Sequence, residues 1–145
     1  MGRLAQTLGV MNDIELIRKI AMQLRKAIQT TDASKRPPLL VNFPRGACGW
    51  SSLLLGAAFI DHGIHGFLYT SGERLSLDRE RWVSHSWLQG NGLIVDLTSD
   101  QFPDGLSEFV LSDQSKWHSQ FEPTKSSPAD FRISLGPPEF DSLRR

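Results

Sequence analysis

The chain has 145 residues, of which 39% are hydrophobic and 22% are charged, and its 16 basic side chains balance 16 acidic ones. This composition is typical of one globular domain with a substantial core, and the balanced charge argues against nucleic acid or an anionic membrane as the main partner. The single cysteine, Cys48, cannot form an internal disulfide, so an oxidising compartment is not implied. No apolar run approaches the roughly 20 residues that cross a bilayer, and no secretory signal pattern is present. We therefore expect a cytoplasmic protein, although delivery as an effector by a specialised secretion system would leave no such pattern.

The first predicted element is an amphipathic helix over residues 12–28. Asn12 followed by Glu15 resembles a capping box, in which side chains satisfy the unpaired N–H groups of a first helical turn. Apolar residues then recur at the spacing of one helix face, and basic or amide side chains fill the other face. The apolar positions are Leu16, Ile17, Ile20, Ala21, Leu24, Ala27 and Ile28. We expect this helix to cover a sheet or another helix.

A second helix is predicted over residues 48–61, directly after a turn rich in proline and glycine. A short apolar run at 39–43 leads into the turn at 44–49. The helix is apolar nearly all round, which predicts that it is buried, and Gly63 stands where such a helix ends.

The rest of the chain predicts short strands and an extended tail. Strand patterns cover 66–70, 82–88 and 93–97, with one more near 108–111. The charged segment 71–81 is typical of a solvated loop, or of a lid over a cleft. We expect a single domain over 1–145 with its core at about 39–121, and residues 122–145, rich in serine, proline and charge, to extend over the surface.

The only cysteine stands where the second helix begins. Unpaired N–H groups and the positive end of the helix dipole favour the thiolate form of a cysteine at this place. A lone cysteine is more often a small buried apolar residue. A catalytic interpretation of Cys48 therefore needs a histidine and an acid at the same point in space.

A predicted hairpin supplies such a pair. If residues 90–91 form a two-residue turn, His85 lies opposite Asp96; if residues 91–92 form it, Asp96 lies diagonally from His85. Either register puts both side chains on one face, within about 5–8 Å at Cβ, whereas a three-residue loop would put them on opposite faces. Asp96 can then fix the tautomer of His85, which leaves the other ring nitrogen for a thiol.

Three motifs together resemble the transglutaminase-like branch of the papain-like thiol enzymes. These are a cysteine at a helix start, a His-x-Trp strand and an Asp-x-Thr strand, carried by Cys48, His85, Trp87, Asp96 and Thr98 within roughly residues 42–102. The resemblance implies an α+β fold whose catalytic helix packs on an antiparallel sheet. It also implies Cys48 as nucleophile, His85 as base and Asp96 as orienter. Members of that branch include peptidases, amidases, deamidases and acyl transferases.

Candidates for oxyanion and substrate binding are less specific. Papain-like enzymes often place a glutamine several residues before the nucleophile, and Asn42 is the amide side chain at comparable spacing here. The N–H of Cys48 is one candidate oxyanion donor, and Asn42 or the N–H of Trp50 is a second. Trp50 and Trp87 are candidate substrate platforms, although packing in the core is the more frequent role of tryptophan.

The paired histidines His62 and His65 invite a metal interpretation, with Cys48 or His85 as a third ligand. They flank Gly63 at the predicted helix end, where a polar, cationic terminus suits the helix dipole. We therefore expect no metal and no cofactor.

The sequence thus predicts a cysteine protease or deamidase, a thiol-dependent amidohydrolase that works through a Cys-His-Asp triad and a thioester. Its substrate would be a peptide, a protein or a small amide. A transglutaminase-type acyl transferase and a non-catalytic protein-binding module that keeps the fold are the alternatives. The sequence leaves the substrate and the oligomeric state open.

Overall fold

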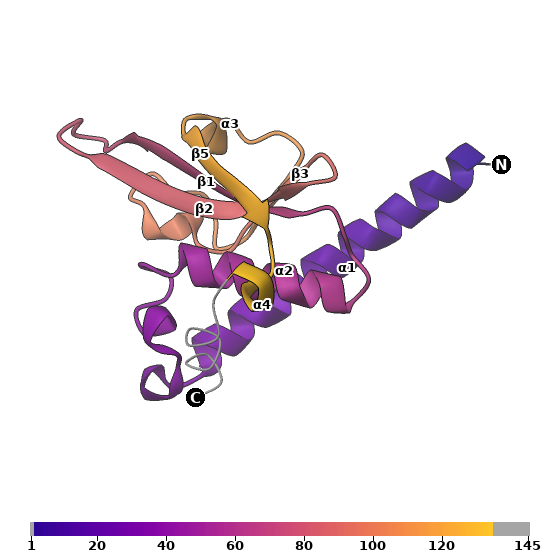
Figure 1. Cartoon of the computed structure of the whole chain (residues 1–145), viewed down its shortest axis with the longest axis horizontal. Coiled ribbons are helices and arrows are strands. Elements are labelled where there is room, and N and C mark those ends of the chain that lie inside the picture. The colour runs from indigo at the N-terminus through magenta and orange to yellow at the C-terminus, as the bar shows by residue number, and fades with distance from the viewer. Residues whose placement is uncertain (1, 135–145) are drawn as a thin grey trace.

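The computed structural model describes residues 2–134, with side chains from 13 to 132. The chain is a mixed α+β structure, as predicted, and Figure 1 shows its elements. In chain order the helices and strands are α1 (Gly2–Thr30), α2 (Cys48–Asp61), β1 (Leu68–Leu75), β2 (Trp82–Gly90), β3 (Leu93–Asp96), β4 (Val110–Ser112), α3 (Lys116–Ser119), β5 (Glu122–Pro128) and α4 (Phe131–Ser134). No helix within the described residues is long and apolar enough to cross a membrane.

The five strands form one sheet in the order β4-β3-β2-β1-β5, and every neighbouring pair is antiparallel. Helix α2 packs on one face of this sheet, with α1 beneath it, and the short helix α3 lies on the opposite face (Figure 1). The main core lies between α1, α2 and the sheet; its members include Ile17, Ala21, Leu55, Phe59, Leu88 and Val95. The prediction of a helix packed on an antiparallel sheet is confirmed.

Both predicted helices form. The amphipathic segment 12–28 lies within α1, whose apolar face is buried at Ile17, Ile20 and Ala21. The predicted start at Asn12 is wrong, because α1 already begins at Gly2 and residues 12–15 lie inside the helix rather than cap it. Helix α2 has the predicted bounds, and Gly63 follows it with a φ of +77°, a left-handed conformation that glycine adopts without strain.

The β2–β3 hairpin has the second of the two predicted registers. Leu88 pairs with Val95 and Gly90 pairs with Leu93, so the turn consists of Asn91 and Gly92. Both turn residues have positive φ, +53° and +74°, as the tight Asn-Gly hairpin turn requires. This register puts His85 and Asp96 on the same face of the sheet, diagonally related.

The prediction of a solvated loop over residues 71–81 is partly wrong. Strand β1 continues through this segment as far as Leu75, because β2 and β5 pair with it on both sides. Arg74 is buried rather than solvated, since its guanidinium binds Asp104 at 2.6 Å and lies against the rings of Phe121 and Trp117.

Part of the predicted tail is also structured. Residues 122–128 form β5, which pairs with β1 through the backbone although most of its side chains are exposed. Ala129 is buried against α2: a Cβ added at Gly56 would lie 1.8 Å from its carbonyl oxygen. Backbone pairing with β1 and the close packing of Ala129 on α2 order a segment whose composition predicts exposure. Residues 135–145 of the predicted tail lie outside the described residues.

Candidate active site

Cys48 begins α2, as the sequence predicts. Its predecessor Ala47 offers no side-chain acceptor, and the N–H groups of Cys48, Gly49 and Trp50 have no hydrogen-bond partner among the described residues. These groups form the positive end of the helix dipole, directly beside the half-buried thiol. The helix start therefore favours a negative charge at the Cys48 sulfur.

The thiol meets β2 where the sheet is open on the β3 side. β3 pairs with β2 only from Leu88 to Gly90, while β2 itself continues to Trp82. Along this unpaired stretch, the Cys48 thiol interacts with the His85 side chain and with the backbone and hydroxyl of Ser86. The short length of β3 thus leaves room for the helix start to reach the histidine.

His85 connects the thiol to Asp96. Its Nε2 lies 2.6 Å from Asp96 Oδ2, and the two side chains are 0% and 1% exposed. Because a carboxylate only accepts hydrogen bonds, Nε2 carries the proton and Nδ1 is left for the thiol. The Thr98 N–H donates to Asp96 Oδ1 at 2.8 Å, which holds the other carboxylate oxygen. The structure therefore brings Cys48, His85 and Asp96 together in that order.

The charges of the three groups stabilise one another. Burial by itself would raise the pKa of the Cys48 thiol, but hydrogen bonds to His85 and Ser86 and the charge of His85 outweigh it, so this pKa lies below its usual value. Burial opposes the charged form of His85 too, yet hydrogen bonds to Asp96 and Cys48 raise its pKa to about 9. The Asp96 pKa is lowered despite burial, because His118 and His85 both hydrogen-bond to the carboxylate. These directions favour a thiolate–imidazolium pair near neutral pH.

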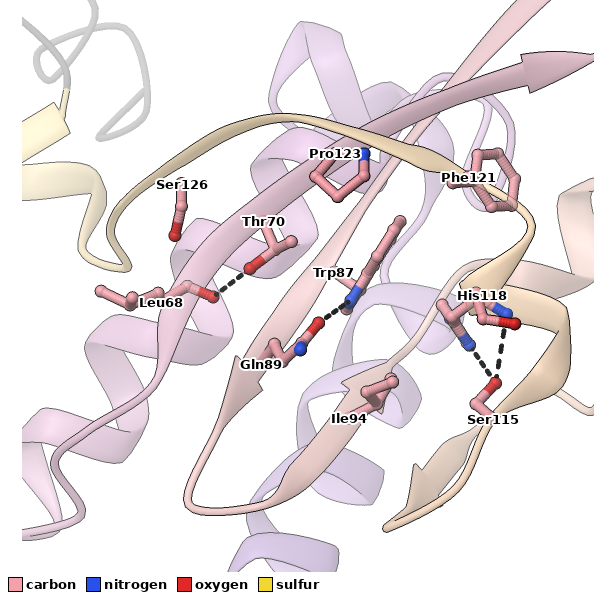
Figure 2. Close-up of a pocket in the computed structure, with 11 residues that line it drawn as sticks. Leu68, Thr70, Trp87, Gln89, Ile94, Ser115, His118, Phe121, Pro123 and Ser126 are labelled. Atoms are coloured by element: carbon pink, nitrogen blue, oxygen red, sulfur yellow. Dashed lines mark hydrogen bonds between the residues drawn. The ribbon is translucent and has the colours of Figure 1, made fainter.

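His118 is a partner of Asp96 that the sequence did not reveal. It lies on α3, and its Nε2 is 2.6 Å from Asp96 Oδ2, the same oxygen that binds His85. Its Nδ1 lies 2.5 Å from the hydroxyl of Ser115, which also caps α3 by accepting from the His118 N–H (Figure 2). The only signal in the sequence was a serine at N-cap spacing before the histidine, which says nothing about Asp96.

His85, Asp96 and His118 are also the only group among the described residues that could hold a metal ion by proximity. Their ligand atoms all lie within 4.8 Å of one another. However, each imidazole nitrogen lies 2.6 Å from the carboxylate oxygen. Two ligands on one tetrahedral zinc stand roughly 3.3 Å apart, given bond lengths of about 2.0 Å. The cluster therefore has the spacing of direct hydrogen bonds rather than of a metal site.

Gln101 is a second site residue that the sequence did not reveal. It ends the 3₁₀ turn Ser99–Gln101 that follows Asp96, and its Nε2 lies 3.4 Å from His85 Nδ1 and donates to the Thr98 carbonyl at 3.0 Å. Its Oε1 accepts from the Gly46 N–H at 3.4 Å. Gln101 therefore links the turn before Cys48 to the segment after Asp96, at the ring nitrogen that faces the thiol.

Of the predicted accessory residues, Trp50 keeps its N–H, unpaired among the described residues, at the start of α2 beside Cys48, and Trp87 lies against the His85 ring, whereas Asn42 does not contact the site. Asn42 is exposed, and its side chain makes no hydrogen bond to another described residue, so Gln101 is the amide that contacts the site. Trp50 packs against Leu40 and Ala47, and Trp87 packs in the aromatic cluster on the far face of the sheet, 5.7 Å from the His85 ring. Both tryptophan rings take part in packing, and a role of either in substrate binding stays a prediction.

The paired histidines lie at the opposite end of α2 from Cys48. His62 caps the helix, with its Nδ1 2.8 Å from the Ala58 carbonyl, and both His62 and His65 are exposed. This arrangement confirms the helix-terminus interpretation for His62, whereas His65 lies beyond the helix in the connection to β1.

A chain of hydroxyl groups supports the thiol from the α2 side of the sheet. The Ser86 hydroxyl lies 2.9 Å from that of Tyr69 and 3.0 Å from that of Ser71. A Cβ added at Gly49 would lie 3.3 Å from the Tyr69 hydroxyl. The glycine after Cys48 therefore lets the helix start approach these groups closely.

Two cavities lie near these residues. One of about 380 Å³ lies beside Gln101 and is lined by the β1–β2 connection and the segment after Asp96, including Arg74, Leu77, Arg81, Val83 and Phe102. The other, of about 430 Å³, lies on the sheet face away from α2, with Trp87, Phe121 and His118 in its wall (Figure 2). Gln101 lines the first cavity and also lies 3.4 Å from His85 Nδ1, so this cavity shares a residue with the site.

In comparisons with known proteins, no family model, no curated protein and no solved structure matches this chain. The chemistry of the site is then the basis for assigning a function.

Proposed function

We propose that the protein is a thiol-dependent amidohydrolase with a papain-like, transglutaminase-like core. The observation that supports this best is that His85 binds Asp96 through Nε2 at 2.6 Å and at the same time interacts with the Cys48 thiol, which lowers the thiol pKa. A nucleophile, a base and an orienting carboxylate in this order are what covalent catalysis by a cysteine requires. The position of Cys48 at the start of a helix that packs on an antiparallel sheet also agrees with the family resemblance.

The first half of the reaction forms a thioester. The Cys48 thiolate attacks an amide carbonyl, and the oxygen that becomes negative is stabilised by the Cys48 N–H and by the Gln101 amide, which takes the role predicted for Asn42. When the tetrahedral intermediate collapses, the C–N bond breaks and the leaving amine takes the proton from His85 Nδ1. Asp96 stays ionised throughout and keeps the imidazole in the required tautomer.

The second half regenerates the thiolate. Water gives a proton to His85 Nδ1 and attacks the thioester carbonyl, the C–S bond breaks, and a carboxylic acid leaves. If the leaving group is ammonia from a side-chain amide, the reaction is a deamidation; if it is a peptide amine, the reaction is a proteolysis. If an amine replaces the water, the enzyme is an acyl transferase.

The cavity beside Gln101 is the candidate site for the part of the substrate next to the reacting amide. It combines apolar walls from Leu77 and Val83 with the charged side chains of Arg81 and Asp78. This mixture suits a polypeptide segment better than a purely apolar ligand.

The first test measures the reactivity of Cys48 with iodoacetamide across pH. The proposal expects alkylation of the wild type to continue well below pH 8.5, the ordinary thiol pKa, and His85→Ala to shift the profile up toward that value. His65→Ala, which removes an exposed histidine, is the matched control and leaves the profile unchanged. A profile of an ordinary thiol that His85→Ala does not move would contradict the proposal and favour the binding module.

The second test identifies the reaction. Candidate proteins are incubated with the wild type and with Cys48→Ala, and their intact masses are compared. A gain of about 1 Da that requires Cys48 indicates deamidation, cleavage indicates a peptidase, and amine adducts indicate a transferase.

A further inference from the structure

Asp96 binds two imidazoles through one oxygen. Oδ2 is 2.6 Å from the Nε2 of His85 and 2.6 Å from the Nε2 of His118, whereas Oδ1 accepts from Thr98. To orient His85, Asp96 needs to bind only the His85 imidazole, so the His118 imidazole is an additional partner. The second is 2% exposed and takes no part in the proposed reaction.

The protonation of His118 is defined by its partners. The carboxylate accepts at Nε2, so this nitrogen carries a proton, and Nδ1 is left to accept from the Ser115 hydroxyl at 2.5 Å. Ser115 in turn belongs to the start of α3, where its oxygen also accepts from the His118 N–H. Ser115, the N-cap of α3, thus determines which ring nitrogen of His118 donates a hydrogen bond to Asp96.

Packing alone does not account for a histidine at this position. The ring lies among aromatic side chains, with its centroid 4.8 Å from that of Trp117 and 4.9 Å from that of Trp87. A phenylalanine or leucine would fill such a place without a polar group to satisfy. Instead both nitrogens are engaged, and one of them contacts the residue that orients the catalytic base.

We infer that His118 is a positioning residue of the Cys48 site, which holds Asp96 in the one placement that keeps His85 Nδ1 directed at the thiol. This inference rests on the proposed function. Hydrogen bonds form a continuous chain from His85 through Asp96 and His118 to Ser115, and His85 at its end interacts with the Cys48 thiol. Without the Nε2–H of His118, the buried Oδ2 keeps a single donor, and the carboxylate can rotate away from His85.

The position of His118 makes the inference testable without touching the reacting groups. Figure 2 shows His118 and Ser115 at the wall of the cavity on the sheet face away from α2. A substitution there removes the second imidazole from Asp96 and leaves Cys48, His85 and Gln101 themselves unsubstituted.

The test compares three variants. His118→Leu keeps the volume and removes the donor, His118→Gln keeps an N–H at similar reach, and Ser115→Ala removes the group that sets the His118 tautomer. We measure the pH profile of Cys48 alkylation by iodoacetamide, together with unfolding in urea. We expect His118→Leu to slow alkylation at pH 6 by about tenfold and to move the profile upward. His118→Gln stays within about threefold of the wild type, and Ser115→Ala lies between them.

A purely structural role predicts a different result. All three variants would then lose stability in urea while the alkylation profile of the folded protein stayed that of the wild type, and this outcome overturns the inference. If His118→Leu does not fold, the alkylation profiles of the wild type, His118→Gln and Ser115→Ala are compared instead. A Ser115→Ala profile identical to that of the wild type then overturns the inference. Failure of the proposed function is distinct, because the wild type itself would then show an ordinary thiol that His85→Ala does not alter.

Discussion

Gly46 and Gln101 are joined by a hydrogen bond of 3.4 Å from the Gly46 N–H to the glutamine Oε1, although 55 positions separate them in the chain. This contact ties the turn that presents Cys48 to the turn that follows Asp96. The same amide reaches His85 Nδ1 with its nitrogen. One side chain thus holds the relative positions of the nucleophile's turn and the base.

Gln101→Ala tests the role of this amide. We expect turnover of an amide substrate to fall by about 10²-fold, because one oxyanion donor is lost and the Gly46 turn is released. Asn42→Ala is the control, and we expect it to stay within about twofold since Asn42 is exposed and outside the site. The measurement is kcat/KM for both variants. A large effect of Asn42→Ala with none of Gln101→Ala would reverse the assignment.

The pH dependence of turnover follows from His85. Its pKa in the folded protein is about 9, above its ordinary value of about 6.5, so the imidazolium that protonates the leaving amine persists to about pH 9. Above that pH the imidazole is neutral and the acid is lost, although the thiolate remains. We therefore expect kcat to fall as pH rises through about 9, while alkylation by iodoacetamide does not fall. A decline of both together would contradict this assignment.

Asp96→Asn tests the carboxylate. The amide can no longer accept from both imidazoles as a carboxylate does, so His85 loses the charge that keeps it protonated and its burial then lowers its pKa. We expect turnover to fall on the order of 10²–10⁴-fold, with substrate binding little affected. Asp113→Asn removes an exposed carboxylate and serves as the control. The comparison is made on kcat and KM separately.

Arg25→Met tests an anchor between α1 and the loop that carries Gln101. Arg25 is 5% exposed and binds Asp100 through two nitrogens, at 2.9 and 2.7 Å, and it also donates to the carbonyl of Glu108 at 2.8 Å. Methionine fills similar space but leaves these acceptors without a partner, so we expect a loss of about 2–4 kcal/mol in the free energy of unfolding. The neighbouring exposed residue gives the control: Lys26→Met stays within about 0.5 kcal/mol. Urea denaturation measures both.

The sequence by itself determined the elements that local patterns encode. The helix start at Cys48 is marked by a turn and an apolar run, and the hairpin is marked by Asn91 and Gly92, whose positive φ angles select the tight turn. Because side chains alternate along a strand, two of the plausible turns put His85 and Asp96 on one face. The helix start at Cys48 and the pairing of His85 with Asp96 therefore follow from short-range rules, whereas the α+β core and the catalytic roles of these three residues are what the family resemblance implies.

The tertiary structure decided what depends on contacts between distant segments. Arg25 and Arg74 have the sequence context of solvated charges, yet each is buried because an acidic partner from the segment after Asp96 reaches it. β5 forms because β1 offers it a free edge, a property of the neighbouring strand and not of its own composition. Contacts between distant segments also bring Gln101 and His118 to the site. Gln101 lies on a loop that packs against the Cys48 turn, and His118 lies on a short helix on the far face of the sheet. No periodic pattern in the sequence predicts such contacts, because the residues that make them are neighbours only in the folded chain.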